Sequence, residues 1–304
     1  MQTSRLMRKF LFYIFAIAAS LIIVDRAFGY ANQYMMRRAS GGQTFCQNYV
    51  CFDSNEDIIM LGSSRMRHHY NPIIIEDSLG MTCYNAGEDG AGIILNYGYF
   101  KMITNRYLPK LIIYDVTNFD MYVGDDNSKY LGWLRKFYDE PGIKDIVCSV
   151  SKSEGLKNMS YLYRYNTRCI ATLADFIHPV RSYVKGYSPI EGVLNYDPKQ
   201  NNYDERVVDS LKLNYLSKLI DEVKERGVMI VFLASPQYDT YEGNSYYHPV
   251  ESLCEQKKVP FWNYFYCPVL SGKKLYFQDR EHLNKEGSTI YTNMIVDRLK
   301  SLVD

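Results

Sequence analysis

Short apolar runs and longer amphipathic segments alternate along most of this chain. The runs that predict strands lie at residues 58–61, 81–85, 111–116, 228–233 and 259–263. Continuous apolar runs of this length are typical of parallel strands covered on both faces. A segment at about 204–226 has helical spacing, with one apolar stripe made of Val207, Leu211, Tyr215, Leu219 and Val223. The pattern predicts a three-layer α/β/α fold with a central parallel sheet of about five strands and right-handed crossovers.

Two stretches interrupt this alternation. Residues from about 120 to 202 contain no strand-helix repeat and carry helix breakers such as Pro141 and Pro179. We interpret them as an insertion above the carboxyl ends of the strands, where insertions commonly set ligand choice. Residues 31–56 are polar and contain a pair of glycines, so we expect an irregular, membrane-proximal linker. The α/β domain is therefore predicted to span residues 57–304.

The N-terminal segment has the pattern of a membrane anchor. Arg5, Arg8 and Lys9 precede an uncharged, mostly apolar run from Phe10 to Val24. Fifteen helical residues rise about 22 Å, short of a bilayer core of about 30 Å, although flanking basic side chains can extend the span. We predict a cytoplasmic stub and signal anchor at residues 1–30. The basic cluster favours an N-terminus in the cytoplasm, with the domain outside.

A cleaved signal peptide is the alternative interpretation of the same segment. Ala27 and Gly29 supply small residues for a cleavage site, although Arg26 and Phe28 fit such a site poorly. The protein would then be secreted. A third interpretation makes the segment a core helix of a soluble cytoplasmic enzyme, but soluble enzymes rarely begin with a basic cluster and such a run.

Composition and charge narrow the class of partner. The chain has 304 residues, of which 47% are hydrophobic, enough for a substantial core. Its 35 basic and 34 acidic residues give a net charge of +1, and no basic stripe is evident, so we expect no nucleic-acid partner.

The cysteines leave two interpretations open. Cys46 and Cys51 are close enough in sequence to form a disulfide in an oxidising compartment, as are Cys254 and Cys267. Free buried thiols that act as small apolar side chains are equally consistent with the pattern. None of the seven cysteines belongs to a set with metal-ligand spacing, so we predict neither a metal nor a cofactor.

Candidate chemistry lies directly after the first apolar run. Gly62, Ser63 and Ser64 follow Leu61, so the backbone turns at the carboxyl end of a buried strand, the edge where open α/β sheets bind ligands. A helix-capping loop is the alternative, because serine is also a good N-cap. Far downstream, Asp279 and His282 have the spacing at which a carboxylate orients an imidazole that serves as base to a serine.

These stretches resemble the SGNH (GDSL-like) hydrolase family. The residues Gly62-Ser63-Ser64-Arg65 are similar to its nucleophile block, with Ser63 where the family usually has Asp, and Asp279 to Gly287 are similar to its closing block. The resemblance implies a flavodoxin-like fold with the strand order 2-1-3-4-5, and a catalytic triad of Ser64, His282 and Asp279.

The same resemblance implies an oxyanion hole formed by the N–H groups of Ser64 and Gly90 and the side chain of Asn118. Gly90 closes an N-x-G-x-x-G pattern that begins at Asn85; a dinucleotide site would instead need a G-x-G start after the first strand. The third block departs from the family, with Val116 in place of Gly and Phe119 in place of Asp.

Other polar residues compete for roles at the same edge. Asp115 and Asp120 are alternatives to Asn118, although all three are also ordinary loop-capping residues. His68 and His69 lie within one helical turn of Ser64, which leaves them little freedom to aim at its hydroxyl. We therefore assign both histidines to the surface or to substrate contact. A metal site built from these two and His282 lacks any recognised ligand spacing, so we do not expect one.

The expected function is a membrane-anchored, extracytoplasmic serine esterase or acyltransferase. The resemblance suggests O-acyl groups, and O-acetyl groups above all, of cell-surface polysaccharide, or another small ester, and it allows a membrane protein as acyl-transfer partner. The alternative is a catalytically silent module of the same fold that binds glycan or a partner membrane protein. The degraded third block favours the module, whereas the retained Ser64, Asp279 and His282 favour the enzyme.

Overall fold

The computed structural model describes residues 2–180, 183–198, 206–239 and 244–303. The chain forms two compact units. The first combines residues 1–45 with 132–180, and the second combines residues 46–131 with 181–304. The boundary after residue 45 falls inside the predicted linker. The boundary after residue 131 places residues 132–180, which are part of the predicted insertion, in the same unit as the N-terminal helix.

The second unit is built on one parallel sheet, as the apolar runs predict. Its strands are β1 (Ile58–Gly62), β2 (Cys83–Asn85), β3 (Leu111–Asp115), β4 (Met229–Ala234) and β5 (Phe261–Asn263). Their order is β2-β1-β3-β4-β5 and all four pairings are parallel, which confirms the predicted topology. The register sets Gly62 beside Asp115, and Asp115 beside Leu233, so three strands end together at one edge.

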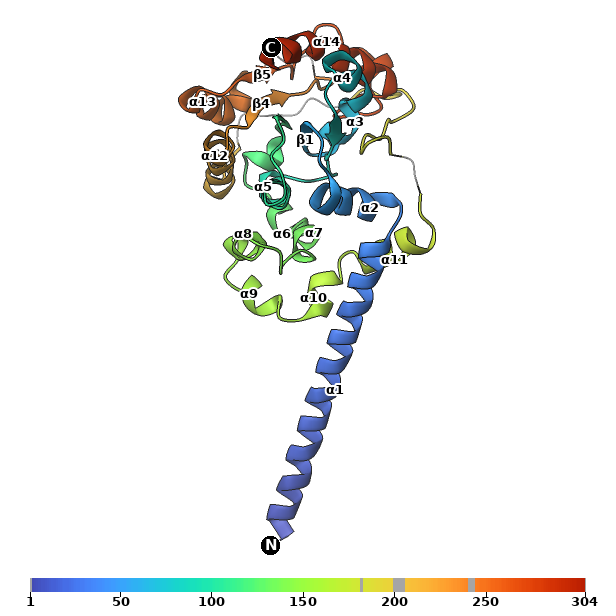
Figure 1. Cartoon of the computed structure of the whole chain (residues 1–304), viewed down its shortest axis with the longest axis vertical. Helices are drawn as coiled ribbons and strands as arrows, with labels where there is room; N and C mark the ends of the chain where they lie inside the picture. The colour runs from blue at the N-terminus through green and yellow to red at the C-terminus, as the bar shows by residue number, and fades with distance from the viewer. Residues whose placement is uncertain (1, 181–182, 199–205, 240–243, 304) are drawn as a thin grey trace. The chain divides into compact units, whose positions relative to one another are not determined.

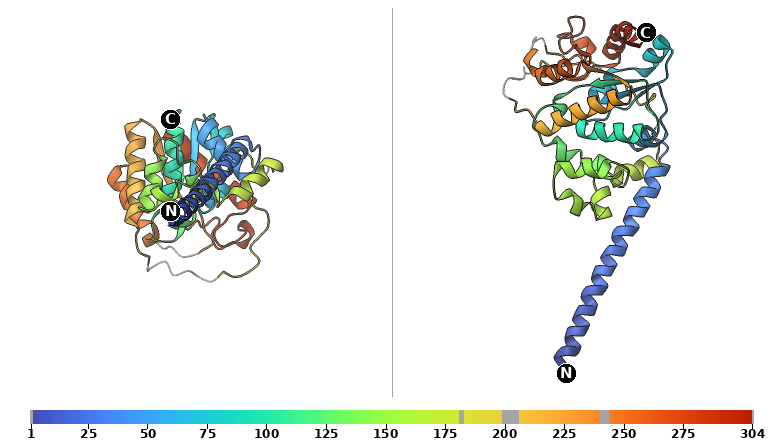
Figure 2. Two further views of the ribbon diagram at one scale, coloured as in Figure 1. Left: turned by 90° about the horizontal axis from the view of Figure 1, so that it is seen from below. Right: turned by 60° about the vertical axis from the view of Figure 1, so that its left-hand side comes forward.

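Helices cover both faces of this sheet (Figure 1 and Figure 2). On one face α3, α4 and α14 pack together, and on the other α5 packs against α12, which in turn contacts α13. Alternate strand residues such as Ile58 and Met60 contribute to one core with Tyr291 and Ile295 of α14. The helical elements of this unit are η1 (Tyr49–Asp53), α3 (Ser64–His69), α4 (Pro72–Leu79), α5 (Ile93–Thr104), η2 (Asn118–Asp120), α6 (Asp126–Lys129), α12 (Ser210–Glu225), η3 (Asn244–Tyr247), α13 (His248–Lys257), η4 (Lys274–Tyr276) and α14 (Lys285–Val303).

The helix expected at about 204–226 begins later than the apolar stripe suggested. Residues 204 and 205 lie outside the described residues, and Val207 is exposed rather than part of the buried stripe. The side chain of Asp209 accepts hydrogen bonds from the N–H groups of Leu211 and Lys212. This N-cap starts α12 at Ser210, because the capping carboxylate satisfies N–H groups that would otherwise lack a partner.

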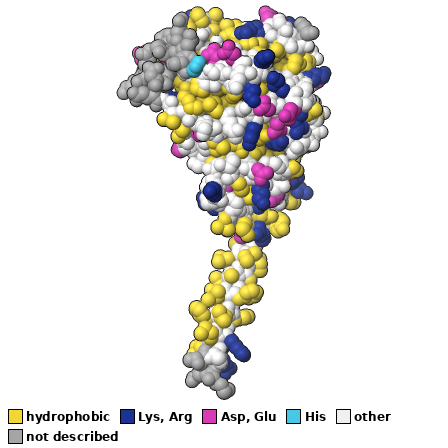
Figure 3. Space-filling model, turned by 90° about the vertical axis from the view of Figure 1, so that its left-hand side faces the viewer, with side chains coloured by type: hydrophobic (Ala, Val, Ile, Leu, Met, Phe, Trp, Pro, Cys, Tyr) yellow, Lys and Arg dark blue, Asp and Glu magenta, His cyan; other side chains and the backbone are white. Residues whose placement is uncertain are grey.

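The first unit contains the longest helix, α1 (Gln2–Arg38). Its Ser4–Arg38 portion is long and apolar enough to cross a membrane, and hydrophobic side chains cover the projecting helix in Figure 3, with basic side chains near its N-terminal end. The same unit contains the short helices α7 (Gly132–Arg135), α8 (Ile143–Val150), α9 (Glu154–Lys157), α10 (Tyr161–Tyr165) and α11 (Cys169–Ile177).

Residues 31–56, expected to be irregular, are mostly helical. They comprise the end of α1, α2 (Gly42–Asn48) and a π-helical turn, η1 (Tyr49–Asp53). Tertiary contacts explain the difference for α1, because Tyr34 packs against Phe176 of α11 and Gly29 fits against Tyr161 of α10. The polar composition of this segment carried no sign of these partners.

All seven cysteines lie in the described part of the chain, and none of them forms a disulfide. Of the four considered for pairing, Cys51, Cys254 and Cys267 are buried and Cys46 is half-buried. The structure therefore favours the second interpretation, in which buried thiols pack as small apolar groups.

Candidate active site

The turn after β1 places Ser64 at the first position of a helix. Gly62 has φ +155°, and a Cβ there would lie 2.9 Å from the Cβ of Met66 and 3.0 Å from the carbonyl oxygen of Asp115, so only glycine fits. Ser63, not Ser64, is the N-cap of α3: its hydroxyl accepts a hydrogen bond from the N–H of Arg65. The N–H of Ser64 belongs to the first turn, where N–H groups have no partner within the helix.

Ser64, His282 and Asp279 form one hydrogen-bonded chain. Oγ of Ser64 lies 2.8 Å from Nε2 of His282, and Nδ1 of His282 lies 2.9 and 3.0 Å from the two carboxylate oxygens of Asp279. All three residues belong to the second unit. The structure thus brings together the three residues that the sequence predicted as a triad, although they come from opposite ends of the domain.

The surroundings of Asp279 keep its carboxylate ionised. Partial burial alone would raise the pKa of Asp279, but the hydrogen bond and charge of His282 and the backbone N–H groups of Glu281 and His282 together hold it below its usual value. An ionised carboxylate accepts a hydrogen bond from the N–H at Nδ1, so Nε2 of His282 presents its lone pair to the Ser64 hydroxyl. This is the tautomer that a general base requires.

The loop that carries the triad carboxylate and imidazole is held on both sides. The N–H of Gln278 donates to the carbonyl of His282 at 3.0 Å, and Phe277 pairs with Leu283 in an antiparallel bridge. Arg280 forms a mostly buried ion pair with Asp239 at 2.8 Å. These contacts fix the positions of Asp279 and His282 relative to the rest of the second unit.

His69 is completely buried, which corrects its assignment to the surface or to substrate contact. Its Nε2 accepts a hydrogen bond from the N–H of Leu283 at 3.0 Å, so its proton must be on Nδ1 and is donated to Oγ of Ser235 at 3.0 Å. The Ser235 hydroxyl in turn donates to Asp115 at 3.1 Å. Burial, followed by the nearby His282 and Arg65, lowers the pKa of His69 well below its ordinary value, so the ring stays neutral.

Asp115 is part of a buried network and not an oxyanion donor. It is fully buried and accepts hydrogen bonds from the Tyr70 hydroxyl at 2.7 Å and the Ser235 N–H at 2.9 Å. Its carboxylate lies 3.5 Å from Nε of Arg65, which also donates to the Tyr247 hydroxyl. Burial raises the pKa of Asp115 and the charge of Arg65 opposes that rise. Because the side chain is fully buried in this network, it has a structural role in place of the competing role that its position suggested.

His68, on α3, also lies close to the triad. Its Nδ1 donates to the carbonyl of Ser188 at 2.6 Å, and its ring centroid lies 5.7 Å from that of His282. Its Nε2 lies 3.5 Å from Asp89, which is also paired with the buried Arg67 at 2.8 Å. The half-buried position of His68 agrees with its assignment to the surface or to substrate contact.

Gly90 is required by its neighbours as well as by its backbone. It has φ +74°, and a Cβ there would lie 2.3 Å from the ring of Tyr130. The loop continues to Gly92, where a Cβ would lie 2.3 Å from the carbonyl oxygen of Phe119. The loop just after the second predicted block therefore packs against Phe119 of the third block. At Gly90 itself a side chain is excluded by the Tyr130 ring.

Asn118 begins the short helix η2 just after β3. Thr117 caps this helix, and Asp120 completes a capping box by accepting from the Thr117 N–H at 2.7 Å. Asp120 is fully buried and also accepts from the Tyr114 hydroxyl; burial raises its pKa to about 7. Asp120 is thus a structural residue, and among the described residues the half-buried Asn118 side chain has no hydrogen-bond partner. Its role in an oxyanion hole stays a prediction.

Sequence reasoning missed three members of the supporting network: Arg65, Tyr70 and Ser235. The available signal was the position of Ser235, which directly follows β4 at the same sheet edge as Ser64. Parallel strands end at one edge, so a small polar residue there is a candidate for the site. No comparable signal marks Tyr70, because only packing turns its hydroxyl toward Asp115.

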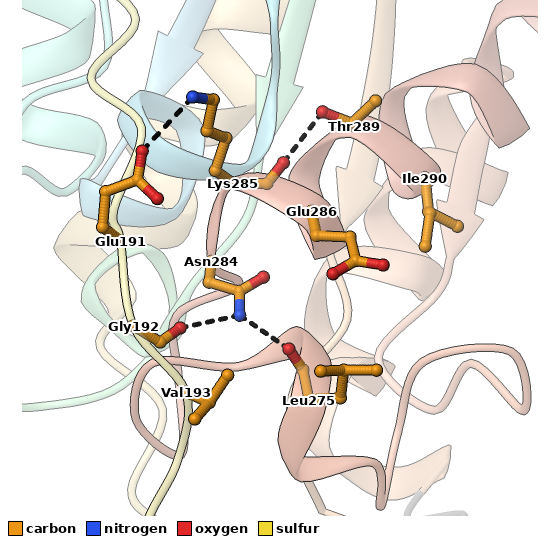
Figure 4. A pocket seen from close by; sticks show the side chains of 9 residues that line it. All are labelled: Glu191, Gly192, Val193, Leu275, Asn284, Lys285, Glu286, Thr289 and Ile290. Carbon is orange, nitrogen blue, oxygen red and sulfur yellow. Dashed lines mark hydrogen bonds and ion pairs between the residues drawn. The ribbon is translucent and has the colours of Figure 1, made fainter.

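A separate cavity of about 570 Å³ lies where residues 191–193 cross the start of α14 (Figure 4). In it, the side-chain amide of Asn284 donates to the carbonyl oxygens of Gly192 and Leu275, and Lys285 pairs with Glu191 at 3.3 Å. None of the triad residues lines this cavity. Within the described residues, no cluster of three or more His, Cys, Asp or Glu side chains is arranged to hold a metal ion.

Comparisons with known proteins show similarity to solved hydrolase structures at low scores. No protein-family model matches the chain. An acetylxylan esterase from Geobacillus stearothermophilus is 12% identical, with 81% of this chain and 94% of that chain covered and a TM-score of 0.42. A candidate lipolytic protein of the G-D-S-L family from Desulfitobacterium hafniense is 10% identical, with 79% of this chain and 97% of that chain covered and a TM-score of 0.41. A candidate acylhydrolase from Bacteroides fragilis is 11% identical, with 81% of this chain and 88% of that chain covered and a TM-score of 0.40. Likenesses this low add no evidence about the activity of this chain.

Proposed function

We propose that this protein is a serine esterase or O-acyltransferase that uses Ser64, His282 and Asp279. The observation that carries the proposal is the continuous hydrogen-bonded chain from Ser64 Oγ through the His282 ring to the Asp279 carboxylate. A serine hydroxyl is a poor nucleophile until an adjacent base accepts its proton, and a base held by a third group is the arrangement that activates it.

In the proposed reaction Ser64 attacks an ester carbonyl as His282 takes its proton, and Asp279 stabilises the imidazolium. The N–H groups of Ser64 and Gly90, with the Asn118 amide, would hold the oxyanion. His282 then gives its proton to the departing alcohol, which leaves an acyl group on Ser64. Water, or a hydroxyl of an acceptor, attacks this acyl group with His282 again as base, and the products are a free acid or a new ester.

The proposed substrates are O-acyl groups, O-acetyl above all, of cell-surface polysaccharide. The choice of substrate class rests on location, since a domain anchored outside the membrane meets envelope polymers first. The basic residues before the apolar run favour that orientation. The apolar α1 supports either a lasting membrane anchor or a signal peptide whose cleavage would release the domain outside the membrane. A membrane protein that delivers acyl groups would be the natural partner of a transferase.

Covalent labelling of the full-length protein in detergent by a fluorophosphonate probe tests the triad. We expect Ser64 to be labelled in the wild type, and labelling to be lost in Ser64→Ala and in His282→Ala. Ser301→Ala, which removes an exposed serine from α14, is the matched control and should label normally.

A folded wild-type protein that does not react with the probe would contradict the proposed enzyme. The silent module that binds glycan or a membrane protein would then be the better explanation. If labelling succeeds, release of acetate from acetylated polysaccharides, with and without an added sugar acceptor, separates hydrolysis from transfer.

A further inference from the structure

Three exposed apolar side chains of the first unit lie close together in sequence, where α9 leads into α10, and are called the cluster below. Leu156, Met159 and Leu162 are 75%, 63% and 45% exposed. Between them Asn158 is buried and its amide donates to Glu154, which holds the connection in one conformation. A cluster of large apolar side chains in a structured turn is costly in water and suggests an apolar partner.

The N-terminal helix locates this cluster along the apolar span. The carboxylate of Asp25, the first charged residue after the apolar run, accepts hydrogen bonds from the Ser160 hydroxyl at 2.6 Å and from the N–H groups of Tyr161 and Leu162 at 3.0 and 2.9 Å. Asp25 therefore caps the start of α10. The α9–α10 turn lies at the level where the apolar run of α1 ends.

Further contacts make this junction close and specific. A Cβ at Gly29 would lie 1.8 Å from the Tyr161 ring, so the backbone of α1 packs directly against this side chain of α10. The guanidinium of Arg26 lies 4.5 Å from the centroid of the same ring, and Tyr30 packs against its edge. Tyrosine and arginine are typical of the membrane interface, because their apolar parts enter it while their polar ends stay hydrated.

The length of the apolar run points in the same direction. Residues 10–24 span about 22 Å as a helix, about 8 Å less than the bilayer core. A short span draws the flanking structure toward the membrane. Asp25 tolerates that position because three hydrogen bonds already satisfy its carboxylate.

The charges around the cluster fit the phosphate groups of lipids. Lys152 and Lys157 are exposed on either side of Leu156, and Arg26 is partly exposed at the end of the apolar run. Apolar side chains surrounded by basic ones are the pattern of segments that lie in the membrane interface.

We propose that Leu156, Met159 and Leu162 form a second membrane contact, inserted into the headgroup region of the bilayer that α1 crosses. The partner is an anionic phospholipid surface. This inference rests on the membrane attachment in the proposed function, and it adds that the first unit lies on the membrane and does not move freely on a tether.

The test uses the full-length protein in vesicles of phosphatidylethanolamine and phosphatidylglycerol, with Trp introduced at Met159. Lipids brominated high on their acyl chains quench a Trp that enters the interface. The matched control is Ile170→Trp, at a position 81% exposed on α11 of the same unit. The native Trp133 and Trp262 are both 7% exposed and give a constant background.

We expect several-fold stronger quenching of the Trp at 159 than of the Trp at 170. Equal quenching at both positions in protein that floats with the vesicles would overturn the second contact and leave the anchor intact. Protein that does not float with vesicles would overturn the anchor as well. If circular dichroism shows that Met159→Trp does not fold, the quenching of a Trp in Leu156→Trp tests the same contact. Fluorophosphonate labelling of these variants tests the esterase proposal separately.

Discussion

The backbone N–H of Leu283 donates a hydrogen bond to Nε2 of His69 at 3.0 Å. This contact joins the helix that begins with Ser64 to the residue that follows His282. His69 lies five residues after the proposed nucleophile and Leu283 one residue after the proposed base, so a single buried imidazole sets the distance between two distant parts of the chain. The same ring continues through Ser235 to Asp115, where β3 ends.

Replacement of His69 by Ala should therefore slow the reaction without removing any triad member. The change leaves the buried N–H of Leu283 without a partner, which costs about 1–3 kcal/mol, and lets the His282 loop shift. A displacement of about 1 Å can cost about a hundredfold in rate. The measurement is the rate of fluorophosphonate labelling, with the exposed His178→Ala as control. His69→Gln, whose amide oxygen can accept from Leu283, should recover part of the rate; an unchanged rate in His69→Ala would contradict the positioning role.

Asp279→Asn tests whether the carboxylate sets the tautomer of His282. An amide cannot hold the proton on Nδ1 in the same way, and exchanges of this kind cost up to about 10⁴-fold in kcat in serine hydrolases. We expect a loss of at least about a hundredfold in kcat with little change in KM. Glu281→Gln removes an exposed carboxylate two residues away and should retain activity. Equal effects of the two changes would argue for a general charge effect instead.

Gly90→Ala should impair catalysis far more than Gly80→Ala. Both glycines have positive φ, +74° and +66°, so both changes carry a similar backbone cost of about 1 kcal/mol. Nothing lies within 4 Å of a Cβ at Gly80, whereas one at Gly90 would meet the Tyr130 ring. The loop at 90 must move, and the predicted oxyanion donor moves with it. Steady-state kinetics on an ester substrate, compared with thermal unfolding of both variants, separates catalysis from stability.

Asn118→Ala tests the remaining oxyanion donor. Removal of one such donor typically lowers kcat by about 10²–10³-fold. The Asn118 side chain has no hydrogen-bond partner among the described residues, so the variant should unfold at the same temperature as the wild type. Normal kcat in this variant would show that the third block has lost its catalytic part and that the two backbone N–H groups suffice.

Asp120 should make stability depend on pH. Burial raises its pKa to about 7 in the folded protein, whereas an unfolded Asp loses its proton near pH 4. Between these values the folded state binds more protons, so the unfolding free energy falls as the pH rises, by on the order of 1 kcal/mol per pH unit. Asp120→Asn mimics the protonated acid and should flatten this slope between about pH 4 and 7. The exposed Asp77→Asn should keep the wild-type slope in pH-dependent thermal unfolding.

The sequence by itself determined the sheet. Five apolar runs became five parallel strands, because strands buried on both faces must be apolar throughout. Their order is the one that the resemblance to the SGNH hydrolases implied. The sequence also indicated Ser64, Asp279 and His282 as a candidate triad, because these are the residue types that a triad needs. Ser64 follows the first strand, and Asp279 and His282 precede the last helix. The structure brings their side chains within hydrogen-bond distance.

Only the tertiary structure decided which residues hold Ser64, His282 and Asp279 in place. His69 and Ser64 lie on the same short helix, and no local pattern distinguishes a buried imidazole from an exposed one. Residues 31–38 read as a polar linker but continue α1, because α10 and α11 pack against them. Local sequence records propensity and periodicity, whereas burial and hydrogen-bond partners between residues far apart in the chain exist only once the chain has folded.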